Sequence, residues 1–222
     1  MLSFSEAVRK RRSYRGFLPT PVPQEKLIRI LEDAQRAPSN CNTQPWNVHI
    51  VSGQKLATLS VLLHEKYQTG DITPDFTFDM NHFYSVYGER KDSQGKAYYD
   101  ALNVARDDSD GRKRASGYNL SFFNAPHVAL LFVPSFGDNV RVAGDIGMYG
   151  QTLLLSLTAH GLGGIPQTSL GFYAEPIRQF LNIPRDMKML FGISFGYPDE
   201  SAPGNRMKMD RVNINESVTF HS

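Results

Sequence analysis

The chain of 222 residues contains one cysteine, Cys41, and one tryptophan, Trp46. A single cysteine excludes an internal disulfide framework and a multi-cysteine metal site, and it is typical of a reducing compartment. The charges nearly balance, with 24 Lys and Arg against 22 Asp and Glu and a net charge of +2. So small an excess argues against nucleic acid or an anionic membrane as a partner.

Long apolar runs are also missing. The first residues, MLSFSEAVRKRRSYR, hold no apolar core of the kind that signal peptides have, and no run reaches the length of a membrane span. The six histidines never lie three or four residues apart, and the carboxylates form no ligand pattern, so no metal site is expected. These absences predict a cytoplasmic protein without a membrane partner.

Helical and strand patterns alternate along the chain. Helical periodicity predicts helices within 22–37, 53–67, 141–160 and 175–183, whereas apolar or alternating runs predict strands within 46–52, 127–133 and 187–197. The tail 211–220 alternates like an edge strand. The helix within 141–160 is apolar nearly all round, which predicts burial in a core or a subunit interface. The class is α/β or α+β, with helices covering a sheet.

The pattern dissolves from residue 69 to about residue 90. This segment contains Pro74, Gly88 and five aromatic residues: Phe76, Phe78, Phe83, Tyr84 and Tyr87. A long irregular segment in a compact domain is either a lid or a disordered insertion, and the aromatic content favours a lid. Residues 91–117 are polar and are expected to be helical in part, with a break around DDSDG.

The stretch RAPSNCNTQPW, residues 36–46, concentrates hydrogen-bonding side chains in one connection. Ser and Asn side chains often bond their own backbone in turns, which accounts for part of this composition. Alternatively, a polar ligand satisfies these groups together. Cys41 has no histidine close in sequence to activate it, so we interpret it as a small packing residue.

The stretch VRKRRSYR carries five basic residues between positions 9 and 15. Cations complement the carboxyl-terminal end of a helix, which is one interpretation. A nucleic-acid patch is a second, although no other basic run extends it. A site for one phosphate monoester is a third, because Arg11, Arg12, Ser13 and Arg15 offer guanidinium forks and a hydroxyl.

Two glycine-containing motifs resemble known functional loops. GLGGIPQTS, residues 161–169, follows a helix rather than a strand, so the context of a dinucleotide-binding loop is missing. A helix end followed by a turn explains it locally, and its glycines also permit close approach to a flat group. GISFG, residues 192–196, matches the serine-hydrolase elbow at Ser194, but the apolar alternation continues through the serine as in a strand.

Four segments in order, RRSYRGF, APSNCNTQPW, GLGGIPQTS and APGNRMKMDR, together resemble the FMN-dependent nitroreductase family. The resemblance implies an α+β fold with three α/β/α layers, a central mixed but mostly antiparallel sheet, and an intertwined homodimer. It implies one domain over residues 1–222, with a variable lid insertion at about 69–125. A carboxyl-terminal strand extension at about 206–222 would add to the other subunit's sheet.

The resemblance also implies which residues hold FMN. Arg11, Ser13 and Arg15 would bind the phosphate and ribityl chain, with Arg12 as support and Arg211 completing the phosphate site. Pro38, Ser39, Asn40 and Asn42 would reach the flavin from the partner subunit. Ile165, Pro166 and Gln167 would lie along one face of the flavin ring, and Phe76, Phe83, Tyr84 and Tyr87 would form the substrate lid.

The implied activity is ping-pong transfer of hydride from NADH or NADPH, through N5 of FMN, to a nitroaromatic, a quinone or another flat acceptor. The cofactor carries this chemistry, so no catalytic side chain is expected. The chain departs from many relatives at Gln167 and Thr168, where an acidic residue is common, and at Met209, where lysine is common. Reductive dehalogenation, oxidase activity, ligand binding without turnover and a serine hydrolase using Ser194 remain alternatives.

Overall fold

The computed structural model describes residues 2–222, and it contains one four-stranded sheet. The strands are β1 (Asn47–Ser52), β2 (His127–Pro134), β3 (Gly163–Gln167) and β4 (Met187–Gly196), in the order β1-β2-β4-β3. All three strand pairs are antiparallel, and parallel pairing is confined to an isolated bridge between Ser13 and Gly164. The predicted α+β class and the predicted strands of 46–52, 127–133 and 187–197 are confirmed.

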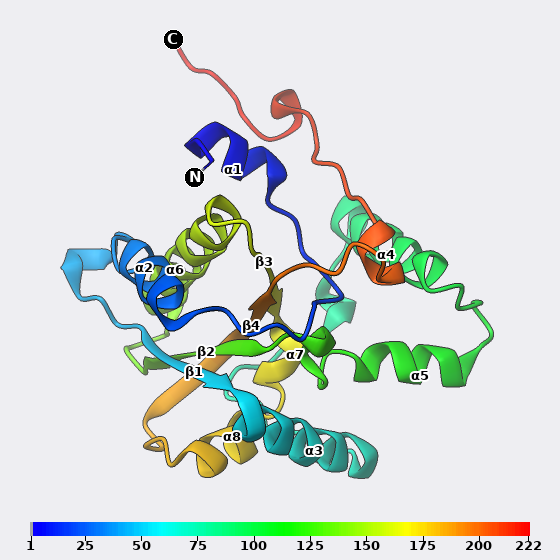
Figure 1. The fold of residues 1–222 in the computed structure, drawn as a ribbon. Coiled ribbons are helices and arrows are strands. Elements are labelled where there is room, and N and C mark those ends of the chain that lie inside the picture. The colour runs from blue at the N-terminus through cyan, green and yellow to red at the C-terminus, as the bar shows by residue number, and fades with distance from the viewer. Residues whose placement is uncertain (1) are drawn as a thin grey trace.

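Strand β2 divides the interior into two cores. Val128, Leu130 and Phe132 pack toward α3 (Gly53–Thr69) and α8 (Ala174–Leu181). The residues between them, such as Ala129 and Leu131, pack toward α2 (Gln24–Ala34) and α6 (Val140–Ala159). Because side chains alternate across a strand, one uninterrupted apolar run fills both layers. Figure 1 shows the result, with α2 and α6 on one face of the sheet and α3 and α8 on the other.

The helices begin and end where local chemistry favours it. In α1 (Phe4–Lys10), Ser3 and Glu6 form a capping box. Helix α3 ends at Gly70, which adopts a left-handed conformation with φ of +69°. Helix α6 is buried on one side, whereas another of its faces is exposed along Gly144, Gly147, Met148 and Gln151, so burial of that face in a subunit interface remains a prediction. The helix is therefore not buried all round within one chain.

The variable region between residues 69 and 125 is more helical than expected. An irregular segment covers 70–84 with a single turn, η2 (Met80–His82), and it is followed by α4 (Ser85–Ala101) and α5 (Ser109–Gly117). The break between these helices lies at 102–108 rather than across DDSDG, because Asp108 caps α5 by accepting the N–H of Gly111. The turn η3 (Phe122–Asn124) then leads into β2.

The tail does not form the edge strand that its alternation suggested. Beyond η4 (Pro203–Arg206), the described chain contains only the short turn η5 (Ile214–Glu216), and the tail extends away from the body (Figure 1). An internal capping box between Asn213 and Glu216 stabilises the turn in place of a strand. Pairing with another subunit remains a prediction. No helix among residues 2–222 combines the length and apolarity that a membrane crossing requires.

His127 ties three segments together at the first position of β2. Its Nε2 accepts the N–H of Val22 at 2.9 Å, its Nδ1 lies 2.5 Å from Oγ of Ser52, and its ring stacks on Phe195. A nitrogen that accepts a backbone N–H carries no proton, so the ring is neutral. Burial lowers the pKa of His127 accordingly.

This pairing predicts lower stability at acidic pH. Since the folded pKa lies below the ordinary histidine value of about 6.5, the unfolded chain takes up a proton first as pH falls through that value. We expect a lower urea midpoint at about pH 5.5 than at about pH 7.5. His127→Gln should reduce this difference between the two urea midpoints. Part of the difference should remain, because burial also lowers the pKa of His49. A variant with the same difference as the wild type would contradict this assignment.

Candidate functional site

The residues after α1 lie along the edge strand β3. Ser13 bridges Gly164, and the N–H of Tyr14 donates to the Gly164 carbonyl at 3.4 Å. A side chain at Gly163 would overlap the Tyr14 ring. The flat group that approaches this glycine pair is therefore the chain's own tyrosine. GLGGIPQTS begins with a turn at Gly161, forms β3 and enters the short helix α7 (Thr168–Gly171), so its strand was missed from the sequence.

Asn205 fastens the amino-terminal segment to the segment before the tail. Its buried amide donates to the carbonyls of Gly16 (2.9 Å) and Asp199 (2.7 Å), and its Oδ1 accepts the N–H of Arg15 (2.5 Å). The Arg12 guanidinium donates to the carbonyl oxygens of Asn205 and Met207. At least one amino group of Arg12 is therefore already occupied by the protein, and its supporting role in the cofactor site remains a prediction.

Arg15 extends into the same region with unused hydrogen-bonding capacity. Its guanidinium lies 5.1 Å from the ring centroid of Tyr98, and its buried Nη1 has no hydrogen-bond partner within residues 2–222. Burial is the main cause that lowers the pKa of Arg15. A buried donor without a partner costs about 1–3 kcal/mol, so an acceptor from outside the chain would stabilise this arrangement.

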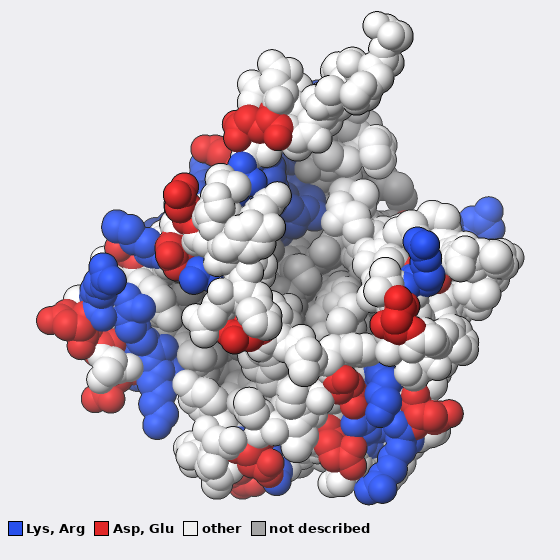
Figure 2. All heavy atoms as spheres, turned by 180° about the vertical axis from the view of Figure 1, so that it is seen from behind, with Lys and Arg blue, Asp and Glu red and all other residues white. Residues whose placement is uncertain are grey.

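Arg11 and Arg211 converge from opposite ends of the sequence. Burial lowers the pKa of Arg11, and the charge of Arg211 lowers it further, which means that the two cations are close enough to repel each other. Basic side chains gather at the upper wall of a hollow below the tail (Figure 2). Two adjacent guanidinium groups without an anion are a typical environment for binding a dianion.

The β3 residues of the predicted site have three different environments. Ile165 is buried and Pro166 is exposed. The side chain of Gln167 is buried, accepts the hydroxyl of Ser194 and donates to the carbonyl of Asn119 at 2.9 Å. Only the backbone of Gln167 is left for a ligand. Ser194 is fully buried in the middle of β4, so the hydrolase alternative is wrong.

The polar connection around η1 (Asn40–Asn42) lies apart from these arginines. In Figure 1 the segment after α2 is at the opposite side of the molecule from α4 and η4. Ser39 is partly used inside the turn, because its Oγ accepts the N–H of Gln44 at 2.9 Å, and the N–H of Asn40 donates to Asp145 on α6 at 2.9 Å. Pro38, Asn40 and Asn42 are exposed. One chain alone does not bring the two halves of the predicted site together.

The aromatic segment, residues 69 to about 90, is anchored to the body of the protein at Asp75, and its later residues are exposed. Asp75 forms a two-point pair with Arg178 at 2.6 and 3.0 Å, and these side chains are only 6% and 5% exposed. The ring of Phe78 then packs on Phe172, with centroids 5.8 Å apart. The predicted lid residues differ in exposure, since Phe76 is half-buried whereas Phe83, Tyr84 and Tyr87 are exposed.

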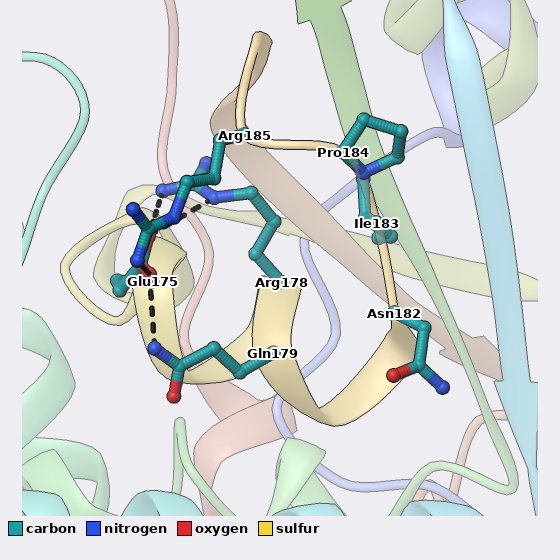
Figure 3. A pocket seen from close by; sticks show the side chains of 7 residues that line it. All are labelled: Glu175, Arg178, Gln179, Asn182, Ile183, Pro184 and Arg185. Carbon is teal, nitrogen blue, oxygen red and sulfur yellow. Dashed lines mark hydrogen bonds and ion pairs between the residues drawn. The ribbon is translucent and has the colours of Figure 1, made fainter.

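A pocket of about 440 Å³ beside α8 is a second concave feature (Figure 3). Its charged side chains and Gln179 already bind one another. Glu175 accepts hydrogen bonds from Arg178 at 2.8 Å and from Gln179 at 2.9 Å, and the side chains converge on the carboxylate in Figure 3. Paired in this way, they stabilise α8 and the start of the aromatic segment rather than await a ligand. Within the described residues no cluster of metal-ligating side chains occurs.

Sequence reasoning missed three residues that hold the site together. Asn205 lies inside the quoted motif APGNRMKMDR, yet nothing local indicated its long-range bonds. Tyr98 lies in a polar helical stretch with no apolar signal, and Asp145 is a lone acid in an apolar helix. A buried acid in an apolar pattern is the one available signal, because it requires a partner such as the Asn40 N–H.

The fold is thus an α+β protein with a four-stranded antiparallel sheet and an arginine-rich segment that runs beside its edge strand. The description "Nitroreductase family" matches residues 8–197, and the chain belongs to that family. Nitroreductase NfnB of Mycolicibacterium smegmatis is 40% identical over 213 residues, covering 96% of this chain and 90% of the relative. A 4-nitrobenzoate reductase of Pseudomonas putida is 34% identical, covering 94% and 91%.

Solved structures agree with this assignment. The FMN-dependent nitroreductase NfnB from Mycobacterium smegmatis, solved in complex with NADPH, superposes with a TM-score of 0.93 at 39% identity, covering 99% of this chain and 100% of that one. An FMN- and NADPH-dependent NfnB from a Sphingopyxis strain gives 0.94 at 32% identity, with full coverage of both chains. The family resemblance of the four motifs is confirmed.

Proposed function

We propose that this protein is an FMN-dependent oxidoreductase that uses NADH or NADPH to reduce nitroaromatics, quinones or similar flat acceptors. The observation that carries the proposal is the buried guanidinium nitrogen of Arg15, which has no hydrogen-bond partner within residues 2–222. The mutual repulsion of Arg11 and Arg211 supports the proposal. Relatives at 40% and 34% identity are named for nitro reduction, and they match nearly the whole chain. The single cysteine supports a cytoplasmic location.

The residues present fit FMN. Its phosphate carries a charge of about −1.5 to −2, which matches two adjacent guanidinium groups, and its ribityl and ring oxygens are acceptors for the buried Nη1 of Arg15. The proposed cofactor contacts are Arg11, Ser13, Arg15 and Arg211 with Arg12 as support, then Ile165, Pro166 and the Gln167 backbone. When bound, FMN accepts hydride from the nicotinamide and delivers it to the acceptor.

The chain's own contribution is binding, orientation and charge. Arginines remain protonated across the working pH range, so this cluster stabilises negative charge and transfers no protons. The exposed Pro166 leaves space beside β3, and the aromatic segment offers flat surfaces on which a planar acceptor packs. No catalytic acid or base is required of these side chains.

The second half of the site comes from another copy of the chain in this proposal. Pro38, Ser39, Asn40 and Asn42 are remote from the arginines of their own chain. The open face of α6, with Gly144 and Gly147, allows a second helix to approach closely. The exposed Phe4 and Val8 of α1 extend this surface, so a homodimer would bury apolar area that one chain exposes. The tail at about 206–222 forms no strand within its own chain, and in this proposal it pairs with the sheet of the partner.

An absorption spectrum of the purified protein, loaded with FMN and kept anaerobic, tests the proposed activity. We expect flavin bands that bleach on addition of NADH or NADPH and return when a nitroaromatic or quinone is added. Bands that do not bleach indicate a binding protein. Return only with a halogenated substrate or with oxygen would favour a dehalogenase or an oxidase. Either result would overturn the assignment.

Arg11→Ala should weaken FMN binding about tenfold or more, because it removes a charge-assisted contact with the phosphate. The measurement is fluorescence titration of apoprotein with FMN. Arg9→Ala is the matched control, since Arg9 is an exposed cation at the end of the same helix and should change the affinity less than about twofold. Equal effects of both substitutions would show that only overall charge matters.

Tyr84→Ala and Phe83→Ala should alter KM for acceptors more than kcat, since both rings are exposed in the aromatic segment. A panel of acceptors of different size, assayed at saturating NADH or NADPH, measures the effect. Phe136→Ala is the control, because Phe136 is a comparably exposed ring in the connection between β2 and α6. Unchanged KM values across the panel would remove the lid role from this segment.

A further inference from the structure

Tyr98 of the variable helix α4 contacts Arg15 of the amino-terminal segment. The Arg15 guanidinium lies over its ring with the carbon 5.1 Å from the centroid. The Tyr98 hydroxyl donates to the Ala115 carbonyl of α5 at 3.2 Å, which fixes the ring relative to both helices. Gly204 packs directly against both side chains, because a Cβ at this position would lie 2.9 Å from Cβ of Arg15 and 3.7 Å from the Tyr98 ring.

The backbone and the side chain of Arg15 are held by different contacts. Its backbone N–H is bound by Asn205, so the Cα position is fixed by the segment before the tail. Within residues 2–222 its guanidinium donates no hydrogen bond, and Nη1 is buried without a partner. The Tyr98 ring is therefore the contact that orients the charged end of this side chain. A cation over an aromatic face contributes more as it is desolvated.

The phenol remains neutral while it does this. Burial raises the pKa of Tyr98 to about 12, despite the nearby Arg15 charge that favours the phenolate. The contact is thus between a cation and a neutral ring throughout the pH range in which the protein works. It leaves the guanidinium donors free, whereas a carboxylate at the same place would occupy them and cancel the charge.

We propose that Tyr98 is a positioning residue for the cofactor, which holds the Arg15 guanidinium in place to bind FMN. The variable insertion then supplies part of the support for the cofactor site in addition to the aromatic segment over the acceptor. This inference rests on the proposed function, because it requires that Arg15 contacts FMN.

The same helix offers a matched control one residue further on. Tyr99 carries the Arg112 guanidinium at 4.1 Å from its ring centroid, which is also a cation–aromatic pair between α4 and neighbouring structure. Arg112 lies on α5 and is not part of the proposed FMN site. Tyr99→Leu therefore removes a comparable cation–aromatic contact from the same helix and keeps the Tyr98 ring over Arg15, while it also removes the contact between the two tyrosine rings, whose centroids lie 5.8 Å apart.

The experiment titrates FMN into apoprotein, followed by flavin fluorescence, for the wild type and for Tyr98→Leu, Tyr98→Phe, Tyr99→Leu, Arg15→Ala and the double variant Arg15→Ala/Tyr98→Leu. We expect Tyr98→Leu to raise Kd about five- to tenfold and Tyr98→Phe, which keeps the ring, to restore affinity to within about twofold. Tyr99→Leu should match the wild type. In the Arg15→Ala background, Tyr98→Leu should have little further effect.

Melting temperatures of the apoproteins separate positioning from loss of fold. If Tyr98→Leu is markedly less stable, Tyr98→Met replaces it, and the non-additivity with Arg15→Ala decides. Equal Kd values for Tyr98→Leu and wild type, or fully additive losses with Arg15→Ala, would overturn the inference while leaving the FMN assignment intact. Wild-type apoprotein that fails to bind FMN would overturn both the inference and the proposed function.

Discussion

The joint between residues 11–16 and the segment before the tail is the constraint on which the site depends. Asn205 satisfies three backbone groups at once, and Arg12 adds bonds to two carbonyls of the same segment. These neutral and charge-assisted bonds hold two ends of the sequence together although both carry arginines. Arg11 and Arg211 therefore stay close in the folded chain although they repel each other, and an anion bound between them would relieve this repulsion. A site built this way costs stability when empty and recovers it on binding.

The layers of the fold were predictable where apolar periodicity was strong. The run HVALLFV predicted β2, and the helical period within 22–37 predicted α2, because burial on both faces of a strand or along one stripe of a helix leaves a simple apolar pattern. Strand β3 was missed because its glycines and proline carry no strand signal. These residues form a strand because they pair with β4. The tail showed the opposite error, since its alternating residues form no strand without a neighbouring strand to pair with.

The sequence indicated which types of residue form the candidate site, but it indicated few of the contacts that hold them in place. The family motifs named Arg11, Ser13, Arg15 and Arg211 as cofactor contacts, which remains a prediction, and they did not name the residues that support these side chains. Tyr98 and Asn205 act across 83 and 190 residues from Arg15, and no local pattern encodes such distances. Gln167 illustrates the same limit, because the family resemblance implied a ligand contact, whereas its side-chain amide is already bonded to Ser194 and Asn119.

Helix α6 holds the polar turn that forms one half of the proposed site. Asp145 fixes the Asn40 turn from one side of this helix, and the neighbouring Gly144 belongs to its open face. Cys41 and Asn42 adopt positive φ, a strained conformation that persists only when the surroundings hold it. In the proposed dimer, the helix that contacts the second copy is also the one that holds this turn. Displacement of α6 would then disturb subunit contact and cofactor binding together, so dimerisation and flavin affinity should be coupled rather than independent.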